Sequence, residues 1–209
     1  MVLEALTGTG LAASAGLNAY IPLLTMGLMA RFTDAITLPS GWQWLSNGWV
    51  LVILALLLAV EVVADKVPVV DHVNDVVQTV VRPTAGGLAF GAGSTSETVK
   101  VTDPATFFGS HQWVPIVSGM LIALSVHGVK AAARPVINAS TAGVGAPVAS
   151  TAEDFGSVLM SVLAILLPIL VLIGIVALAV AAFWVVRRRR WRRRQKRAAE
   201  GYATERLLG

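Results

Sequence analysis

Long hydrophobic runs without charged side chains divide the chain into four candidate membrane spans. Asp, Glu, Lys and Arg are absent from Ala5–Ala30, Gly48–Val60, Pro104–Val129 and Phe155–Val186. The second run continues to about Ala64, and each run is then near or above the ~20 residues that cross the hydrocarbon of a bilayer. A proline inside the last run is tolerated in a transmembrane helix as a kink. The pattern predicts an all-α integral membrane protein with about four transmembrane helices.

The first of these runs is rich in small residues. Gly8, Ala12 and Gly16 recur every four residues, so they share one face of a helix. Small residues on one face allow another helix to approach closely. We favour helix packing for this stripe over the alternative, in which it lines a path for a substrate.

Two further segments resemble each other. Val80–Glu97 and Ala132–Asp154 each run from an Arg-Pro pair through small residues to an acidic residue. Inverted repeats with Gly- or Pro-broken segments at matching positions form the midplane sites of many transporters. Short runs of Gly, Ala and Ser also arise by chance in such a composition. We predict two broken or re-entrant small-residue segments and a candidate inverted repeat.

Composition and charge support this assignment and divide the chain into two parts. Of the 209 residues 56% are hydrophobic and 13% are charged, and the mean hydropathy is +0.73, which excludes an ordinary soluble domain. Nine of the sixteen basic residues lie in 187–197, whereas residues 1–186 carry six basic and ten acidic residues. We therefore expect a transmembrane domain over 1–186 and a basic tail over 187–209.

The basic tail sets the expected orientation. A basic run directly after an apolar helix is typical of a cytoplasmic anchor that contacts anionic lipid headgroups. We prefer this interpretation to nucleic-acid binding, with Arg187, Arg188, Arg189 and Arg190 as the lipid contacts. Four crossings then place both termini in the cytoplasm and 31–47 outside, with Lys66, Arg82 and Lys100 inside. Lys130 and Arg134 fall toward the outer side, against the charge rule.

Charged residues near the ends of two adjacent antiparallel spans form one acidic and one basic helix face, which invite pairing. Glu61 and Asp65 lie one helical turn apart, and His127, Lys130 and Arg134 follow at spacings of three and four. A carboxylate at hydrocarbon depth costs ~2.5 kcal/mol or more, so it must face protein or water. Two interpretations stay open. The groups form buried salt bridges that fix helix register, or they act in transport.

The next segment, "DHVND", offers Asp71, His72, Asn74 and Asp75. Such groups suit a hard or borderline divalent cation, although one helical turn supplies too few ligands. Glu153 and Asp154 add ligands only if the fold brings them near. We therefore consider Asp71, His72 and Asp75 a candidate cation site, with the polar face of an amphipathic interfacial helix as the preferred alternative.

The signatures of common enzymes are missing. The sequence contains no nucleophile elbow, phosphate-binding loop, zinc-protease helix or dinucleotide fingerprint. It contains no cysteine, which excludes thiolate catalysis and cysteine-ligated metal sites. We predict a protein that is not an enzyme and uses no cofactor, although Glu61, Asp65 and His127 are groups that an intramembrane enzyme could use.

Three motifs together carry a family resemblance. They are "GLAASAGLNAYIPLL", "EVVADKVPVVDHVND" and the downstream "RPTAGG". Over roughly residues 5 to 180 the chain resembles a bacterial family of small polytopic membrane proteins known only as a domain of unknown function. The resemblance implies a bacterial membrane protein and implies no reaction, substrate or cofactor.

These observations favour a transport function in the bacterial plasma membrane. We expect a small ion or polar solute, coupled to protons, to pass along residues that lie at membrane depth: Asn18, Glu61, Asp65, His127 and Lys130. The alternative is a non-catalytic scaffold or accessory subunit whose small-residue faces pack into a homo-oligomer or a larger complex.

Overall fold

The computed structural model describes residues 2–66, 68–94, 113–141, 144–174, 176, 177 and 184. For residues 68–73, 75 and 138 it describes the backbone alone. The chain forms two units, residues 1–171 and 172–209. The helices and the candidate site described below belong to the first unit.

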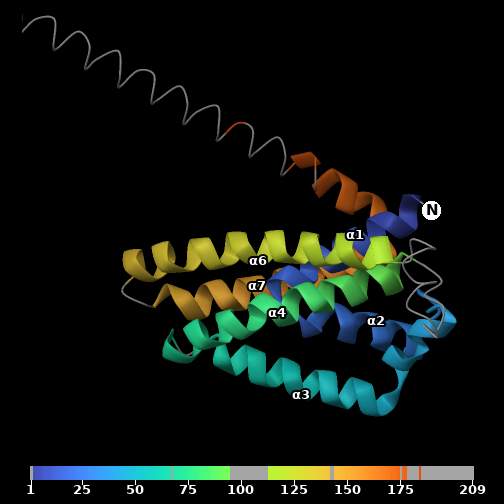
Figure 1. Ribbon diagram of the computed structural model, residues 1–209, viewed down its shortest axis with the longest axis horizontal. Coiled ribbons are helices and arrows are strands. Elements are labelled where there is room, and N and C mark those ends of the chain that lie inside the picture. Colours follow the sequence, from blue (N-terminus) through green and yellow to red (C-terminus); the bar gives the residue numbers. More distant parts are fainter. Residues whose placement is uncertain are drawn as a thin grey trace, which may run out of the picture. The chain divides into compact units, whose positions relative to one another are not determined.

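The described residues form helices and contain no strand, which confirms the predicted all-α class. The elements are α1 (Val2–Leu17), α2 (Tyr20–Phe32), the 3-10 helix η1 (Ser40–Ser46), α3 (Gly48–Ala64), α4 (Pro68–Gly93), α6 (Trp113–Thr141) and α7 (Gly145–Leu166). Figure 1 shows α3, α4, α6 and α7 as long helices that run side by side.

Helix α1 is the central packing element, because it contacts α4, α6 and α7. Its small residues allow these contacts. A methyl group added at Gly16 would lie 2.6 Å from the carbonyl oxygen of Ala123 in α6, and one added at Gly8 would lie 3.0 Å from that of Phe90 in α4. Ala12, between them, is fully buried. The prediction that this stripe serves close helix packing is confirmed.

Helices α4 and α6 also meet through glycine. Gly86 and Gly119 face each other so closely that a side chain on either would collide with the backbone of the other. Both helices continue through the Arg-Pro pairs of the resembling segments, with Pro83 inside α4 and Pro135 inside α6. The predicted breaks do not occur at these prolines. Pro83 is tolerated inside α4 because this helix packs against α1 and α6.

A helix break occurs instead within the first predicted span. Ala5–Ala30 was predicted as one span, but α1 ends at Leu17 and α2 begins at Tyr20. The last predicted span is also interrupted: α7 ends at Leu166, and Leu167 has φ −137° and ψ 65° before Pro168. A residue before proline is pushed out of the α conformation, so the helix is interrupted at Leu167, and helical backbone resumes at Pro168.

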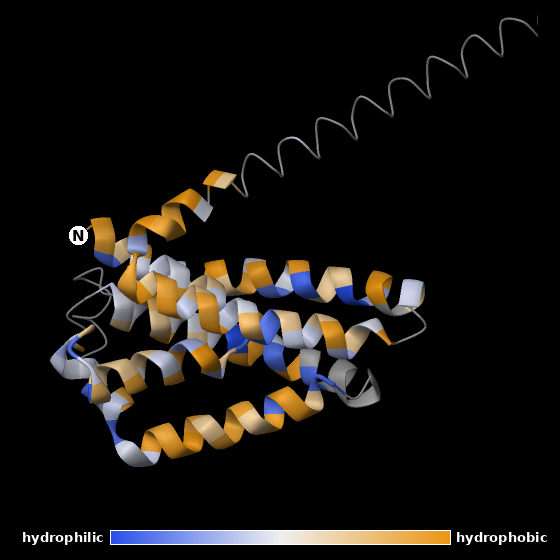
Figure 2. Cartoon of the chain, turned by 180° about the vertical axis from the view of Figure 1, so that it is seen from behind, coloured by the Kyte–Doolittle hydropathy of each residue, from blue (hydrophilic) through white to orange (hydrophobic). Residues whose placement is uncertain are grey.

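The apolar helices are those of a membrane protein. Among the described residues, α6 and α7 are long and apolar enough to cross a membrane, and η1 with α3, bent by 62°, provides a third span if counted together. Helices α1 and α2 are shorter apolar helices. Figure 2 shows α3 almost wholly in hydrophobic colours, and its Val52, Leu56 and Val60 are exposed. The predicted count of four spans thus remains a prediction.

Candidate functional site

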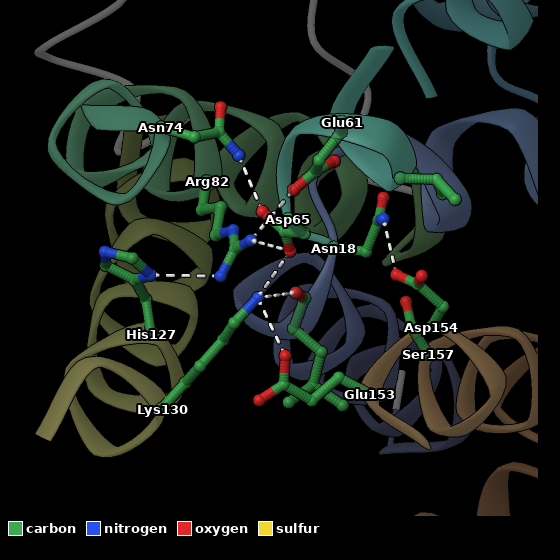
Figure 3. Close-up of polar contacts among 12 residues, drawn as sticks. Asn18, Glu61, Asp65, Asn74, Arg82, His127, Lys130, Glu153, Asp154 and Ser157 are labelled. Carbon is green, nitrogen blue, oxygen red and sulfur yellow. Dashed lines mark hydrogen bonds and ion pairs between the residues drawn. The ribbon is translucent and has the colours of Figure 1, made fainter. Parts of the chain in front are cut away.

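Six charged side chains from four helices meet inside the bundle, and we call them the charge cluster. Its carboxylates are those of Glu61 and Asp65, one helical turn apart at the end of α3, and of Glu153 on α7. Its cations are Arg82 on α4 and Lys130 and Arg134 on α6. Figure 3 shows Arg82 and Lys130 pointing toward Asp65 from different helices.

The first part of the cluster centres on Arg82. Its Nη2 lies 2.8 Å from Glu61 Oε1 and 3.6 Å from Asp65 Oδ2. Its Nη1 lies 3.1 Å from Nδ1 of His127. Arg82 is fully buried. The planar guanidinium presents several donors in fixed directions, so one arginine can join groups from α3, α6 and α1.

The second part centres on Lys130. Its ammonium nitrogen lies 3.1 Å from Asp65 Oδ2 and 2.9 Å from Glu153 Oε2. Arg134, one turn further along α6, lies 3.4 Å from Asp65 Oδ2 and 2.9 Å from Glu153 Oε2. Asn74 Nδ2 donates to the other oxygen of Asp65 at 2.7 Å. Asp65 is therefore the acceptor shared by all three cations of the cluster.

The break between α1 and α2 supplies backbone acceptors to both parts. In a continuous helix the amides of Tyr20 and Ile21 would donate to the carbonyls of Gly16 and Leu17. Here the side-chain oxygen of Asn18 accepts from Tyr20 N at 3.1 Å and from Ile21 N at 3.2 Å. These two backbone amides thus donate to a side chain and leave the carbonyls of Gly16 and Leu17 without their helical hydrogen bonds.

The released carbonyls bond the cations of the cluster. Arg82 Nη1 donates to Gly16 O at 3.4 Å, and Lys130 Nζ donates to Leu17 O at 3.3 Å. The C-terminal end of a helix carries a partial negative charge, which favours cations there. The same Asn18 side chain donates to Asp154 Oδ1 of α7 at 3.0 Å. Asn18 thus links the helix break to α7.

The cluster balances its charges but satisfies its hydrogen bonds incompletely. Three carboxylates face three cations, and burying ions costs several kcal/mol each even when they are paired. Glu61 Oε2, Gln78 Oε1 and Arg82 Nε are buried and lack a hydrogen-bond partner within the described part of the chain. Buried polar atoms without a partner are uncommon in native structures and call for an explanation, such as strain or a functional role.

The structure brings together the residues that the sequence assigned to a path. Asn18, Glu61, Asp65, His127 and Lys130 are all buried and lie in or beside the cluster. The predicted pairing of Lys130 and Arg134 with the acidic face is confirmed for Asp65. Glu61 instead pairs with Arg82.

Arg82 is the main site residue that the sequence analysis missed, because it was considered there only as a charge on the cytoplasmic side, a placement that stays a prediction. The structure buries it within the bundle. A signal was present, because Asn74, Gln78 and Arg82 recur every four residues and form a polar face on α4. From the sequence, Glu153 was considered only as a metal ligand. In the structure Glu153 pairs with Lys130 and Arg134.

Two predicted sites fall outside the structure's description. The side chains of Asp71, His72 and Asp75 are not among those described, and neither are residues 187–190 of the basic tail. Within the described residues no group of three or more His, Asp or Glu side chains is arranged to hold a metal ion. The candidate cation site and the lipid contacts therefore stay predictions.

Comparison with known proteins identifies a family. No similar curated protein and no similar solved structure was found. The model of one family matches residues 5–188, which include every helix of the charge cluster. The chain belongs to the family described as a domain of unknown function (DUF4126).

Proposed function

We propose that the protein passes a small ion or polar solute across the membrane, coupled to protons, along the charge cluster. The path includes the five residues expected from the sequence and gains Arg82, Arg134 and Glu153. The supporting observation is that buried charges of both signs meet at the freed carbonyls of a broken helix. Ionisable residues and discontinuous helices at membrane depth are recurring parts of transporter sites.

The arrangement of the cluster supports ion-pair exchange. Asp65 is shared by three cations, so one of them can leave while two still compensate its charge. Glu61 has one oxygen paired with Arg82 and the other buried without a hydrogen-bond partner in the described part of the chain. A carboxylate held in this way has room to accept a proton. Transport also requires a state that is open to solvent, because Glu61 and Asp65 are buried in this one.

We further propose a setting for this activity: the bacterial plasma membrane, with the C-terminus in the cytoplasm. The basic residues of 187–197 would contribute attraction to anionic lipids of about 1 kcal/mol each near the surface. Assembly into a homo-oligomer belongs to the same proposal, and it would use faces other than the small-residue stripe of α1, which already packs within the chain.

A flux measurement tests the proposal. Purified protein is reconstituted in liposomes that hold a pH-sensitive dye, and gradients of pH and of KCl or NH4Cl are imposed. Wild-type protein should change the internal pH faster than empty liposomes do. Glu61→Gln keeps the size of the side chain but removes its titratable proton, so it should lower the rate to that of empty liposomes. Asp34→Asn, at an exposed acid, is the matched control and should retain wild-type flux.

A scaffold is the second candidate, and a specific observation favours it. Every charged group of the cluster has an ion-pair partner, and the pairs join α3, α4, α6 and α7. Such pairs can fix helix register without any transport. A folded Glu61→Gln protein with wild-type flux would overturn the transport proposal. Wild-type flux no faster than in empty liposomes would also overturn it and would leave the scaffold.

A further inference from the structure

The surroundings of the Lys130 ammonium group form a cage of oxygens. Leu17 O lies 3.3 Å from Nζ, Asp65 Oδ2 lies 3.1 Å away and Glu153 Oε2 lies 2.9 Å away. The oxygens come from the end of α1, the end of α3 and α7, and the Lys130 side chain is 2% exposed. Three separate parts of the chain thus place oxygens around one positive charge.

The chemistry of this cage is that of a cation site. Carboxylate and backbone carbonyl oxygens are hard ligands, and carbonyls freed at a helix break coordinate cations in membrane transporters. The distances from nitrogen to oxygen, 2.9 to 3.3 Å, exceed the ~2.0–2.6 Å at which Mg²⁺ and Ca²⁺ bind oxygen. The cage therefore fits a large ion of single charge.

Charge counting leads to the same class of ion. The charge cluster is balanced only while Lys130 is positive, since two arginines alone face three carboxylates without it. A monovalent cation in place of the ammonium group restores the balance, whereas a divalent cation would overshoot it. Leaving a buried carboxylate uncompensated is strongly destabilising.

We propose that Lys130 occupies a monovalent-cation site with its own ammonium group, and that a cation such as NH4⁺ or K⁺ binds between Leu17 O, Asp65 and Glu153 when this group is removed or withdraws. The step from binding to passage of that cation rests on the proposed function. The binding itself does not, and it is tested without flux.

The test is chemical rescue of Lys130→Ala. The midpoint of thermal unfolding is followed by tryptophan fluorescence in detergent, in equal concentrations of ammonium, potassium, sodium and choline chloride. The variant should have a lowered midpoint in choline, which is too large for the cage, and a saturable rise in ammonium or potassium. Wild-type protein should show the same midpoint in all four salts.

Two controls separate this site from a general salt effect. Lys66→Ala removes a lysine whose side chain is 38% exposed and lies 3.9 Å from Asp154, so its midpoint should not distinguish the cations. Lys130→Ala combined with Glu153→Gln removes the charge of one ligand, so the selective rise should disappear.

Lys130→Ser, which also leaves the place of the ammonium group open, is a second variant in case Lys130→Ala folds poorly. Selective stabilisation of either variant by ammonium or potassium supports the proposal. Equal behaviour in all salts for both variants, including failure of both to fold in any of them, overturns it. Selective cation binding without flux in the wild-type protein would refute transport alone, and flux without any selective effect would refute this site alone.

Discussion

Two of the interfaces between α7 and the rest of the bundle use opposite chemistry. The first is a neutral contact with α1, in which Ser14 Oγ lies 2.7 Å from the hydroxyls of both Ser157 and Ser161. The second is ionic, with Glu153 of α7 between Lys130 and Arg134 of α6. Both join helices, and Ser14, Ser157, Ser161, Lys130 and Arg134 are buried, whereas the Glu153 side chain is 19% exposed. The neutral one requires no desolvation of a charge, whereas the ionic one does.

This difference indicates that adhesion alone does not account for the charge cluster. Small residues and hydroxyl groups already pack α1 tightly against α7. Replacing buried ion pairs by apolar residues of similar volume is often neutral or stabilising in other proteins. A bundle that needed only cohesion could therefore use more contacts of the Ser14 kind. The cluster is better explained by a requirement for charge in the interior.

The largest effect is expected for Arg82→Met, which breaks the ionic side of the comparison. The substitution leaves Glu61 buried without its guanidinium partner and removes a bond to Gly16 O. Removing one member of a buried ion pair costs about 3–5 kcal/mol. We expect a loss of this size in the free energy of unfolding, measured by tryptophan fluorescence during unfolding in mixed micelles.

A matched control and a double variant sharpen this result. Arg31→Met removes an exposed arginine that donates to Ser46 O, and its effect should stay within about 0.5 kcal/mol. Adding Glu61→Met to Arg82→Met removes the orphaned charge, so it should recover about 0.5–3 kcal/mol. Equal free energies of unfolding for Arg82→Met and Arg31→Met would show that the ion pairs of Arg82 do not stabilise the fold.

The sequence predicted much of this site because helical periodicity is a local property. The faces of Glu61 with Asp65, and of Lys130 with Arg134, follow from a spacing of four. Their mutual pairing followed from the cost of burying charge. The partner of Glu61 was missed because a hydrophobic run was used to define each span, and α4 is too polar for that criterion although it lies within the bundle.

The break at Asn18 was also beyond a reading of hydrophobic runs. Ala5–Ala30 contains no charged residue, so a criterion based on charge-free runs does not distinguish one helix from two. At the break, the Asn18 side chain accepts hydrogen bonds from two backbone amides, while Arg82 and Lys130 donate to the carbonyls that those amides would otherwise bond. Asparagine is a preferred acceptor of such amide hydrogen bonds at a helix start, so Asn18 was a local signal, whereas the partners of the freed carbonyls depend on the tertiary fold.

A medium effect is expected for Ser14→Ala, which breaks the neutral side. The substitution removes hydrogen bonds to the hydroxyls of Ser157 and Ser161 but leaves no buried charge. Interhelical hydrogen bonds in membrane proteins contribute about 0.6 kcal/mol on average and up to about 1.7. The same unfolding measurement should therefore show a loss of roughly 0.5–2 kcal/mol. A loss as large as that of Arg82→Met would remove the distinction between the two interfaces.

The smallest effect is expected for Lys66→Ala, which tests whether burial or charge alone separates the interfaces. Lys66 is an ion-pair lysine like Lys130, but its side chain is 38% exposed and its Nζ lies 3.9 Å from Asp154 Oδ2. It also donates to Val62 O of its own helix. Water solvates an exposed pair and salt screens it, so such pairs contribute about 0–1 kcal/mol. Unfolding in mixed micelles should show a loss in this range that shrinks as the salt concentration rises. A salt-independent loss comparable to that of Arg82→Met would contradict this expectation. The pair of Lys66 and Asp154 would then behave energetically like the buried ion pairs of the charge cluster.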